Sequence, residues 1–95
     1  MDLKFIHKEW EDPDKLSGMG IDPEDFRDVI SSFTASENLE IIQRIRYLGY
    51  KEMGTENGHS LFSVDIDSNY QLFATCLHPP SGDPFIEIRS VEPKF

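Results

Sequence analysis

The chain has 95 residues, of which 18 are acidic and nine are basic, so its net charge at neutral pH is −9. A surface this negative repels the phosphates of nucleic acids, so the composition excludes an ordinary nucleic-acid-binding domain and favours a basic protein partner. The aromatic fraction of 12% is too high for a disordered acidic tail, and we expect one folded domain over residues 1–95.

The cellular compartment is predicted from three features: the N-terminal pattern, the length of the apolar segments and the number of cysteines. The first ten residues alternate charged with apolar side chains and contain no apolar run of the kind that a secretory signal needs. No segment approaches the roughly 20 apolar residues that cross a bilayer. Cys76 is the one cysteine, which excludes an internal disulfide. These features predict a cytoplasmic protein without a membrane partner.

Alternation at Leu3–Lys8 predicts a short N-terminal strand with Leu3 and Phe5 on one face. The next segment, Glu9–Gly20, contains one proline, two glycines and four carboxylates, and is predicted to be an acidic loop. We expect Trp10 to attach this loop to the body of the protein, because exposed tryptophan is uncommon. The alternative is that Trp10 lies in an acidic contact patch, since tryptophan is enriched at binding hot spots.

Two helices are predicted next. The first begins with Asp22 as its cap and Pro23 at its first position. Its buried face follows at helical spacing: Phe26, Val29, Ile30 and Phe33. The second is expected to be capped by Thr34 with Glu37, or by Ser36, and to end at Gly49. Its buried face is predicted to be Leu39, Ile42, Ile45 and Leu48.

The second half of the chain changes to the alternating pattern of strands, which are predicted at Tyr50–Met53, Leu61–Ile66, Tyr70–Leu77 and Phe85–Val91. Turns are predicted between them at Gly54–Gly58, Asp67–Asn69 and His78–Pro84. Both faces of the predicted strand Tyr70–Leu77 are partly apolar, which favours a central place for it in the sheet. The chain order predicts an α+β fold: an N-terminal strand, two helices, and a three- to four-stranded antiparallel meander with the helices packed on one face.

No catalytic, metal or cofactor site is predicted. The three histidines, His7, His59 and His78, lie far apart in sequence. Cys76 and His78 are two residues apart and can share a strand face, but the strand is apolar, so a buried, inert thiol is expected. Asp65–Asn69 lacks the glycine and the closing glutamate of a calcium loop, and we interpret it as a turn.

The segment Gly58–Phe73 resembles the central hairpin of the RelE/ParE/HigB toxins. In that family a strand of the form W-S-(I/V)-R-I, a short Asn/Asp turn and a strand of the form (Y/W)-R-(L/I)-x-F follow one another. The resemblance implies the toxin scaffold but not its RNase activity. The mRNA-cutting members rely on basic residues on this sheet, whereas this chain has Asp65 and Gln71 at those positions and keeps only Arg89 on the last strand.

We interpret the chain as a small, acidic, non-enzymatic binding protein of the immunity or antitoxin type. It is expected to neutralise a basic protein, such as a nuclease toxin, by presenting carboxylates to the lysines and arginines of the toxin's nucleic-acid site. Two alternatives stay open. One is a RelE/ParE-like toxin that acts on RNA or on a protein, and the other is a regulatory domain that binds calcium or a small ligand.

Two acidic regions are predicted to contact the partner. The first lies in residues 1–28, which carry nine acids and four bases and therefore a net charge of −5. Its predicted contact residues are Glu9, Glu11, Asp12, Asp14, Glu24, Asp25 and Asp28. The second region is the hairpin end, with Asp65, Asp67, Asn69, Tyr70 and Gln71. Asp65 and Asp67 are expected to dominate the binding energy through buried charge pairs; the competing interpretation is that they only form a strand end and its turn.

Overall fold

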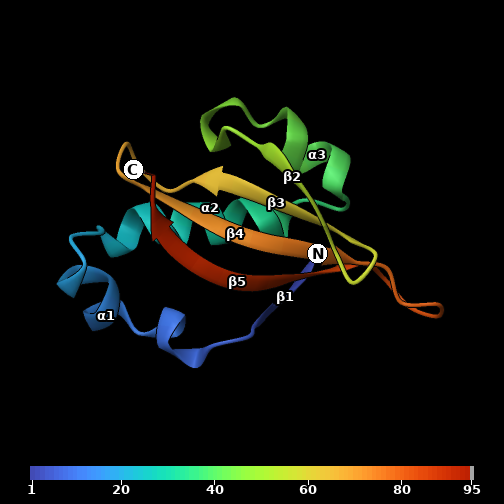
Figure 1. Cartoon of the computed structure of the whole chain (residues 1–95), viewed down its shortest axis with the longest axis horizontal. Helices are drawn as coiled ribbons and strands as arrows, with labels where there is room; N and C mark the ends of the chain where they lie inside the picture. Colours follow the sequence, from blue (N-terminus) through green and yellow to red (C-terminus); the bar gives the residue numbers. More distant parts are fainter. Residues whose placement is uncertain (95) are drawn as a thin grey trace.

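Five strands form one sheet in the computed structural model, which describes residues 1–94 (Figure 1). In chain order they are β1 (Asp2–Phe5), β2 (Lys51–Glu56), β3 (His59–Asp65), β4 (Tyr70–Leu77) and β5 (Phe85–Pro93). Their order across the sheet is β1-β5-β4-β3-β2, and β2 to β5 form an antiparallel meander. The predicted α+β fold with a four-stranded meander is confirmed, and β4 is central as expected.

The first strand joins the sheet beside the last one. β1 pairs with β5 in parallel orientation, with Leu3 opposite Ile86 and Phe5 opposite Ile88. Paired residues of neighbouring strands point to the same face, so these four apolar side chains are directed to one side of the sheet. The sheet therefore brings the first and the last strand of the chain side by side, which no local sequence pattern indicated.

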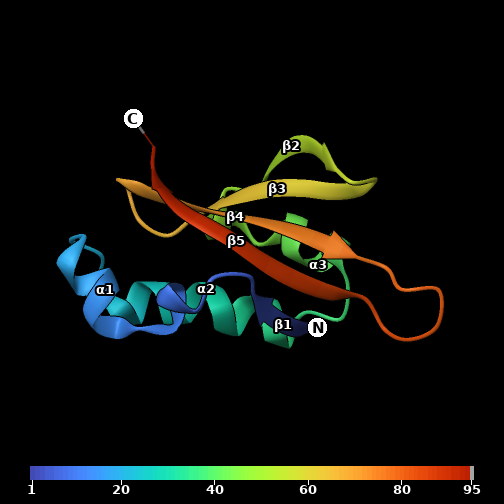
Figure 2. The same cartoon turned by 60° about the horizontal axis from the view of Figure 1, so that its bottom comes forward.

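Five helical segments separate β1 from β2: η1 (Lys8–Glu11), α1 (Pro13–Gly18), α2 (Pro23–Ala35), α3 (Leu39–Arg44) and η2 (Arg46–Leu48). Figure 2 shows α2 running along one face of the sheet, with α1 beside its N-terminal end. The opposite sheet face carries no helix among the described residues, as the prediction of helices on one face requires. None of the helices in residues 1–94 is long and apolar enough to span a membrane.

The segment Glu9–Gly20 is helical for much of its length, so the prediction of a loop was wrong. It forms the short 3-10 helix η1 and the six-residue helix α1. Asp12 caps α1, because its Oδ1 atom accepts a hydrogen bond from the backbone N–H of Asp14 at 2.9 Å, and Pro13 takes the first helical position. Both helices are too short to show an apolar period, which is why the sequence pattern did not reveal them.

The start of α2 is as predicted, and the start of α3 is not. Asp22 Oδ1 accepts from the backbone N–H of Glu24 at 2.9 Å, with Pro23 following. The cap of α3 is Asn38, whose Oδ1 accepts from the N–H of Ile41 at 3.2 Å. The residues expected to cap it lie elsewhere: Thr34 is inside α2, and Ser36 ends that helix.

Boundaries in the second half also differ from the prediction. The helix expected to continue to Gly49 is interrupted at Ile45, where the backbone is extended, and resumes as η2; Gly49 ends η2 in the left-handed conformation. β2 extends to Glu56, so the turn is reduced to Asn57 and Gly58, with φ angles of 53° and 81°. Two successive positive φ angles are those of a type I′ hairpin turn.

The core lies between α2 and the sheet, where burial of apolar surface stabilises the fold. Phe33 of α2 meets Phe62 of β3 edge-on, with ring centroids 6.0 Å apart, and Phe26 of α2 lies 6.4 Å from Phe5 of β1. The predicted helical and strand faces are confirmed as core, with further contributions from the helix-rich N-terminal segment: Trp10, Leu16 and Ile21.

Candidate partner-binding surface

Seven of the predicted contact residues lie on the helices, and we call them the acidic helical surface: Glu9, Glu11, Asp12, Asp14, Glu24, Asp25 and Asp28. They belong to η1, to the start of α1 and to the first half of α2. Six of the side chains are exposed, and Asp25 is half-buried. The structure therefore places six of these seven carboxylates in exposed positions along the N-terminal helical segments, with Asp28 on the side of α2 that faces Tyr47.

Few cations offset this surface. Residues 8–28 contain eight acidic and three basic side chains, which leaves a net charge of −5. Among the described residues its one ion pair joins Lys15 Nζ to Glu9 Oε2 at 3.7 Å, and both side chains are about half exposed. Such exposed pairs contribute at most about 1 kcal/mol and are screened by salt. The remaining carboxylates are free to attract a cationic partner, although Asp12 also caps α1.

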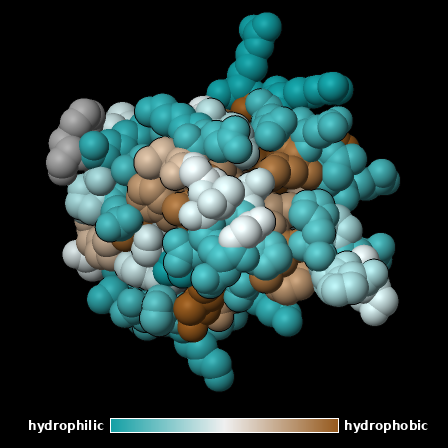
Figure 3. All heavy atoms as spheres, turned by 45° about the vertical axis from the view of Figure 1, so that its right-hand side comes forward, coloured by the Kyte–Doolittle hydropathy of each residue, from teal (hydrophilic) through white to brown (hydrophobic). Residues whose placement is uncertain are grey.

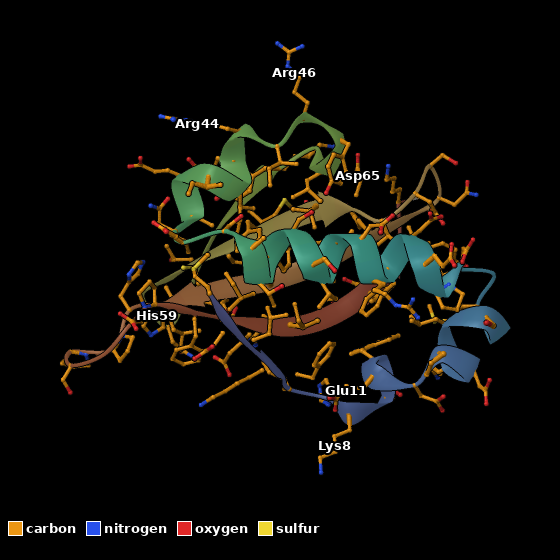
Figure 4. All side chains as sticks on the ribbon, turned by 180° about the vertical axis from the view of Figure 1, so that it is seen from behind. Lys8, Glu11, Arg44, Arg46, His59 and Asp65 are labelled. Carbon is orange, nitrogen blue, oxygen red and sulfur yellow. The ribbon has the colours of Figure 1, made fainter. Side chains whose placement is uncertain are left out.

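The basic residues of the α3–η2 region lie on another edge of the molecule. Figure 4 shows Arg44 and Arg46 pointing away from the body on the side of α3, whereas Glu11 lies on η1 on the opposite side of α2. Residues 41–51 contain three basic and no acidic side chains. Charge is thus unevenly distributed over the described residues, and residues 8–28 carry more net negative charge than the α3–η2 region.

The second predicted region lies at the β3–β4 turn, but most of its polar groups already have partners. Asp65 and Gln71 face each other across the two strands. Asp65 Oδ1 is 3.1 Å from Lys94 Nζ, and this ion pair is partly buried. Asp67 Oδ1 accepts from the backbone N–H groups of Asn69 at 2.7 Å and Tyr70 at 2.8 Å. The predicted turn is confirmed, and these bonds favour the interpretation of Asp67 as a turn residue.

Tyr70 lies on the opposite face of the hairpin from Asp65 and packs against the core. Its hydroxyl donates to the backbone carbonyl of Met19 at 2.6 Å, in the connection between α1 and α2. This hydrogen bond therefore links the end of the β3–β4 hairpin to the segment between α1 and α2, next to residues of the acidic helical surface. Of the five predicted residues at the turn, only Asn69 is fully exposed.

Cys76 is buried in the central strand, and its Sγ atom is 3.7 Å from Nε2 of the exposed His78. Burial raises the pKa of the Cys76 thiol, because the interior solvates the thiolate poorly. The thiol is therefore neutral at physiological pH and covered from solvent. The expected burial of Cys76 is confirmed, and its contact with His78 lacks the thiolate that nucleophilic chemistry requires.

One feature next to the acidic helical surface was not predicted. An apolar hollow of about 260 Å³ lies between β1, the η1–α1 segment and α2. Its apolar wall consists of Phe5, Trp10, Pro13, Leu16, Pro23, Phe26 and Ile30, and Glu11 and Arg27 complete the lining. Trp10 is 8% exposed, which confirms that it attaches this segment to the body. Segments that are distant in sequence form the hollow, so no local pattern could have indicated it.

The helix-free face of the sheet has a different character. Arg89 on β5 lies 3.4 Å from Glu56 on β2, so an ion pair links two strands that are not neighbours. Figure 3, which turns this face partly towards the viewer, shows brown apolar patches separated by teal hydrophilic atoms. In the part of this face that Figure 3 shows, the described residues form no continuous apolar surface.

Within residues 1–94 there is no group of three or more His, Cys, Asp or Glu side chains arranged to hold a metal ion. The resemblance of the hairpin to RelE/ParE/HigB toxins stays a prediction. Neither a protein-family model, nor a curated protein, nor a solved structure matches this chain.

Proposed function

We propose that this protein is a small, non-enzymatic inhibitor that binds and neutralises a basic protein, such as a nuclease toxin. The observation that carries the proposal is the acidic helical surface, where seven carboxylates from η1, α1 and α2 share one intramolecular ion pair. Such a surface attracts the lysines and arginines with which a nuclease binds its phosphate backbone.

The inhibitor acts by occupying the place of the nucleic acid. Long-range attraction speeds the encounter, and the carboxylates then pair with side chains that would otherwise contact phosphates. The helices hold the carboxylates on a packed framework, because the inner sides of η1, α1 and α2 are anchored by Trp10, Leu16 and Phe26. A preorganised surface loses little conformational entropy on binding.

The test begins with co-purification of the partner and measures its association rate by stopped-flow over a range of salt concentrations. The test variant neutralises three residues of the acidic helical surface: Glu11→Gln, Glu24→Gln and Asp28→Asn. The matched control neutralises three exposed carboxylates elsewhere: Glu37→Gln, Glu52→Gln and Glu92→Gln. Both variants make the net charge three units less negative, so they differ only in the position of the lost charge.

We expect the association rate of the unaltered protein to fall about tenfold or more between low and physiological salt. The test variant should associate more slowly than the control and show a weaker dependence on salt. Equal rates for the two variants would assign the attraction to net charge alone, and a rate that is flat with salt would contradict the proposal.

A further inference from the structure

The hollow beside η1 is an apolar site within an acidic neighbourhood. It has a volume of about 260 Å³, which is enough for one large side chain. Its wall presents Trp10, Phe26 and Ile30, and Ile30 is only half-buried. Trp10 Nε1 is buried without a hydrogen-bond partner in residues 1–94, so packing alone holds the indole in the wall.

The charges around the hollow define what can enter it. Glu11 and Arg27 take part in the lining, and no ion pair between them is present in the described residues. The same η1–α1 segment carries three more carboxylates: Glu9, Asp12 and Asp14. Figure 4 shows Glu11 on this segment, with Lys8 directed away from the body of the molecule. Residues 8–28, which supply most of the lining, carry eight acids against Lys8, Lys15 and Arg27, so the surroundings are negative on balance, whereas the wall is apolar.

We propose that the hollow receives an apolar side chain from a basic polypeptide segment, as the anchor of the partner on the acidic helical surface. This inference rests on the proposed function and adds to it a defined contact. The apolar side chain is buried against Trp10, Phe26 and Ile30, and the flanking lysines or arginines of the segment pair with Glu11 and its neighbours. Interfaces commonly combine one such buried anchor with a charged rim.

Two synthetic peptides test the inference directly: acetyl-KRKFKRK-amide, and the same peptide with alanine in place of phenylalanine. Trp10 is the one tryptophan of the chain, so its fluorescence reports on the wall of the hollow. We expect the phenylalanine peptide to change the Trp10 emission and to bind about tenfold tighter than the alanine peptide, because it buries an aromatic ring.

The variant Ile30→Gln places a polar side chain in the wall without changing the charge. Its matched control is Ile41→Gln, the same change at a partly exposed isoleucine of α3. We expect Ile30→Gln to abolish the preference for the phenylalanine peptide, and Ile41→Gln to keep it. Circular dichroism of both variants establishes that they fold.

The outcomes separate this inference from the proposed function. Equal affinity for the two peptides, weakened by salt, would overturn the anchor and leave the acidic surface supported. A preference for phenylalanine that survives Ile30→Gln would place the anchor elsewhere and overturn the inference. Self-association that Ile30→Gln abolishes would assign the hollow to a second copy of the chain, which also overturns it. Absence of salt-dependent binding by either peptide would count against both proposals.

Discussion

The hydroxyl of Tyr70 donates a hydrogen bond to the backbone carbonyl of Met19 across 51 residues of sequence, at a distance of 2.6 Å. This bond joins the β3–β4 hairpin to the connection between α1 and α2. Its acceptor is a main-chain carbonyl that has left the regular part of a helix, where carbonyl groups lack an intrahelical partner. The hairpin therefore helps to hold the segment from which much of the acidic helical surface extends.

We expect Tyr70→Phe to lower the free energy of unfolding by about 1 kcal/mol, because it removes the hydroxyl and leaves the Met19 carbonyl without this donor. Urea denaturation followed by circular dichroism measures the change. The control is Tyr47→Phe, because the Tyr47 hydroxyl bonds to Ser32 in an exposed position. A Tyr70→Phe variant as stable as Tyr47→Phe would show that the bond contributes nothing.

Asp67 organises the β3–β4 turn through its two backbone hydrogen bonds. Asp67→Ala removes the acceptor and should cost about 1 kcal/mol of stability, whereas Asp67→Asn keeps a side-chain carbonyl oxygen and should cost less than about half of that. Thermal or urea unfolding distinguishes the two variants.

The same pair of variants decides whether Asp67 also contacts the partner. If Asp67 acts only in the turn, Asp67→Asn binds the partner as tightly as the unaltered protein. A large loss of affinity in Asp67→Asn, with stability retained, would instead support the prediction that this carboxylate forms a charge pair in the complex.

Gly49 and Asp65 are in close contact where η2 meets the sheet. Gly49 has φ +56°, and a Cβ atom at this position would lie 2.5 Å from Asp65 Oδ2. Gly49→Ala should therefore cost about 2–3 kcal/mol, of which roughly 1 kcal/mol comes from the left-handed backbone and the rest from displacing the carboxylate.

A double-mutant cycle separates these two parts. In the Asp65→Ala background the steric part disappears, so Gly49→Ala should cost about 1–2 kcal/mol less than in the unaltered protein. Urea unfolding of the four proteins measures the coupling. Additive losses would mean that Asp65 moves away from an added methyl group at no cost.

The parts of the fold with strong local signals could be predicted from the sequence. Asp22 followed by Pro23 marks the start of α2, and alternation through Phe62 and Val64 identifies the buried face of β3, because capping and side-chain direction depend on neighbouring residues only. The parallel pairing of β1 with β5 depends on residues more than 80 positions apart, so no local pattern reports it.

In the candidate site, too, some features follow from the sequence and others depend on contacts between distant residues. Net charge and the exposure of residues such as Glu11 and Asp14 follow from composition, because charged side chains are seldom buried. The apolar hollow could not be predicted, since it requires Phe5, Trp10 and Phe26 to meet from three elements. The segment that contributes Trp10 has no apolar period, and its two short helices form against the body of the protein.

The thiol of Cys76 makes the stability of the protein sensitive to alkaline pH. Burial raises its folded-state pKa above the ordinary value of 9.0, so the unfolded chain releases this proton first as the pH rises. The stability that the buried neutral thiol contributes is therefore complete below pH 9 and is lost progressively above it. The loss therefore grows between pH 8 and pH 10.

Cys76→Ala isolates this effect from the other groups that titrate at alkaline pH. At pH 8 the variant should be less stable by about 1 kcal/mol, because removal of the sulfur leaves a small void beside the core. At pH 10 the difference between the two proteins should shrink or reverse, since only the unaltered chain has a thiol to ionise. Urea unfolding at both pH values provides the comparison. A stability difference that stays constant from pH 8 to pH 10, or rapid labelling of the native thiol by a small disulfide reagent at pH 8, would show that Cys76 is open to solvent.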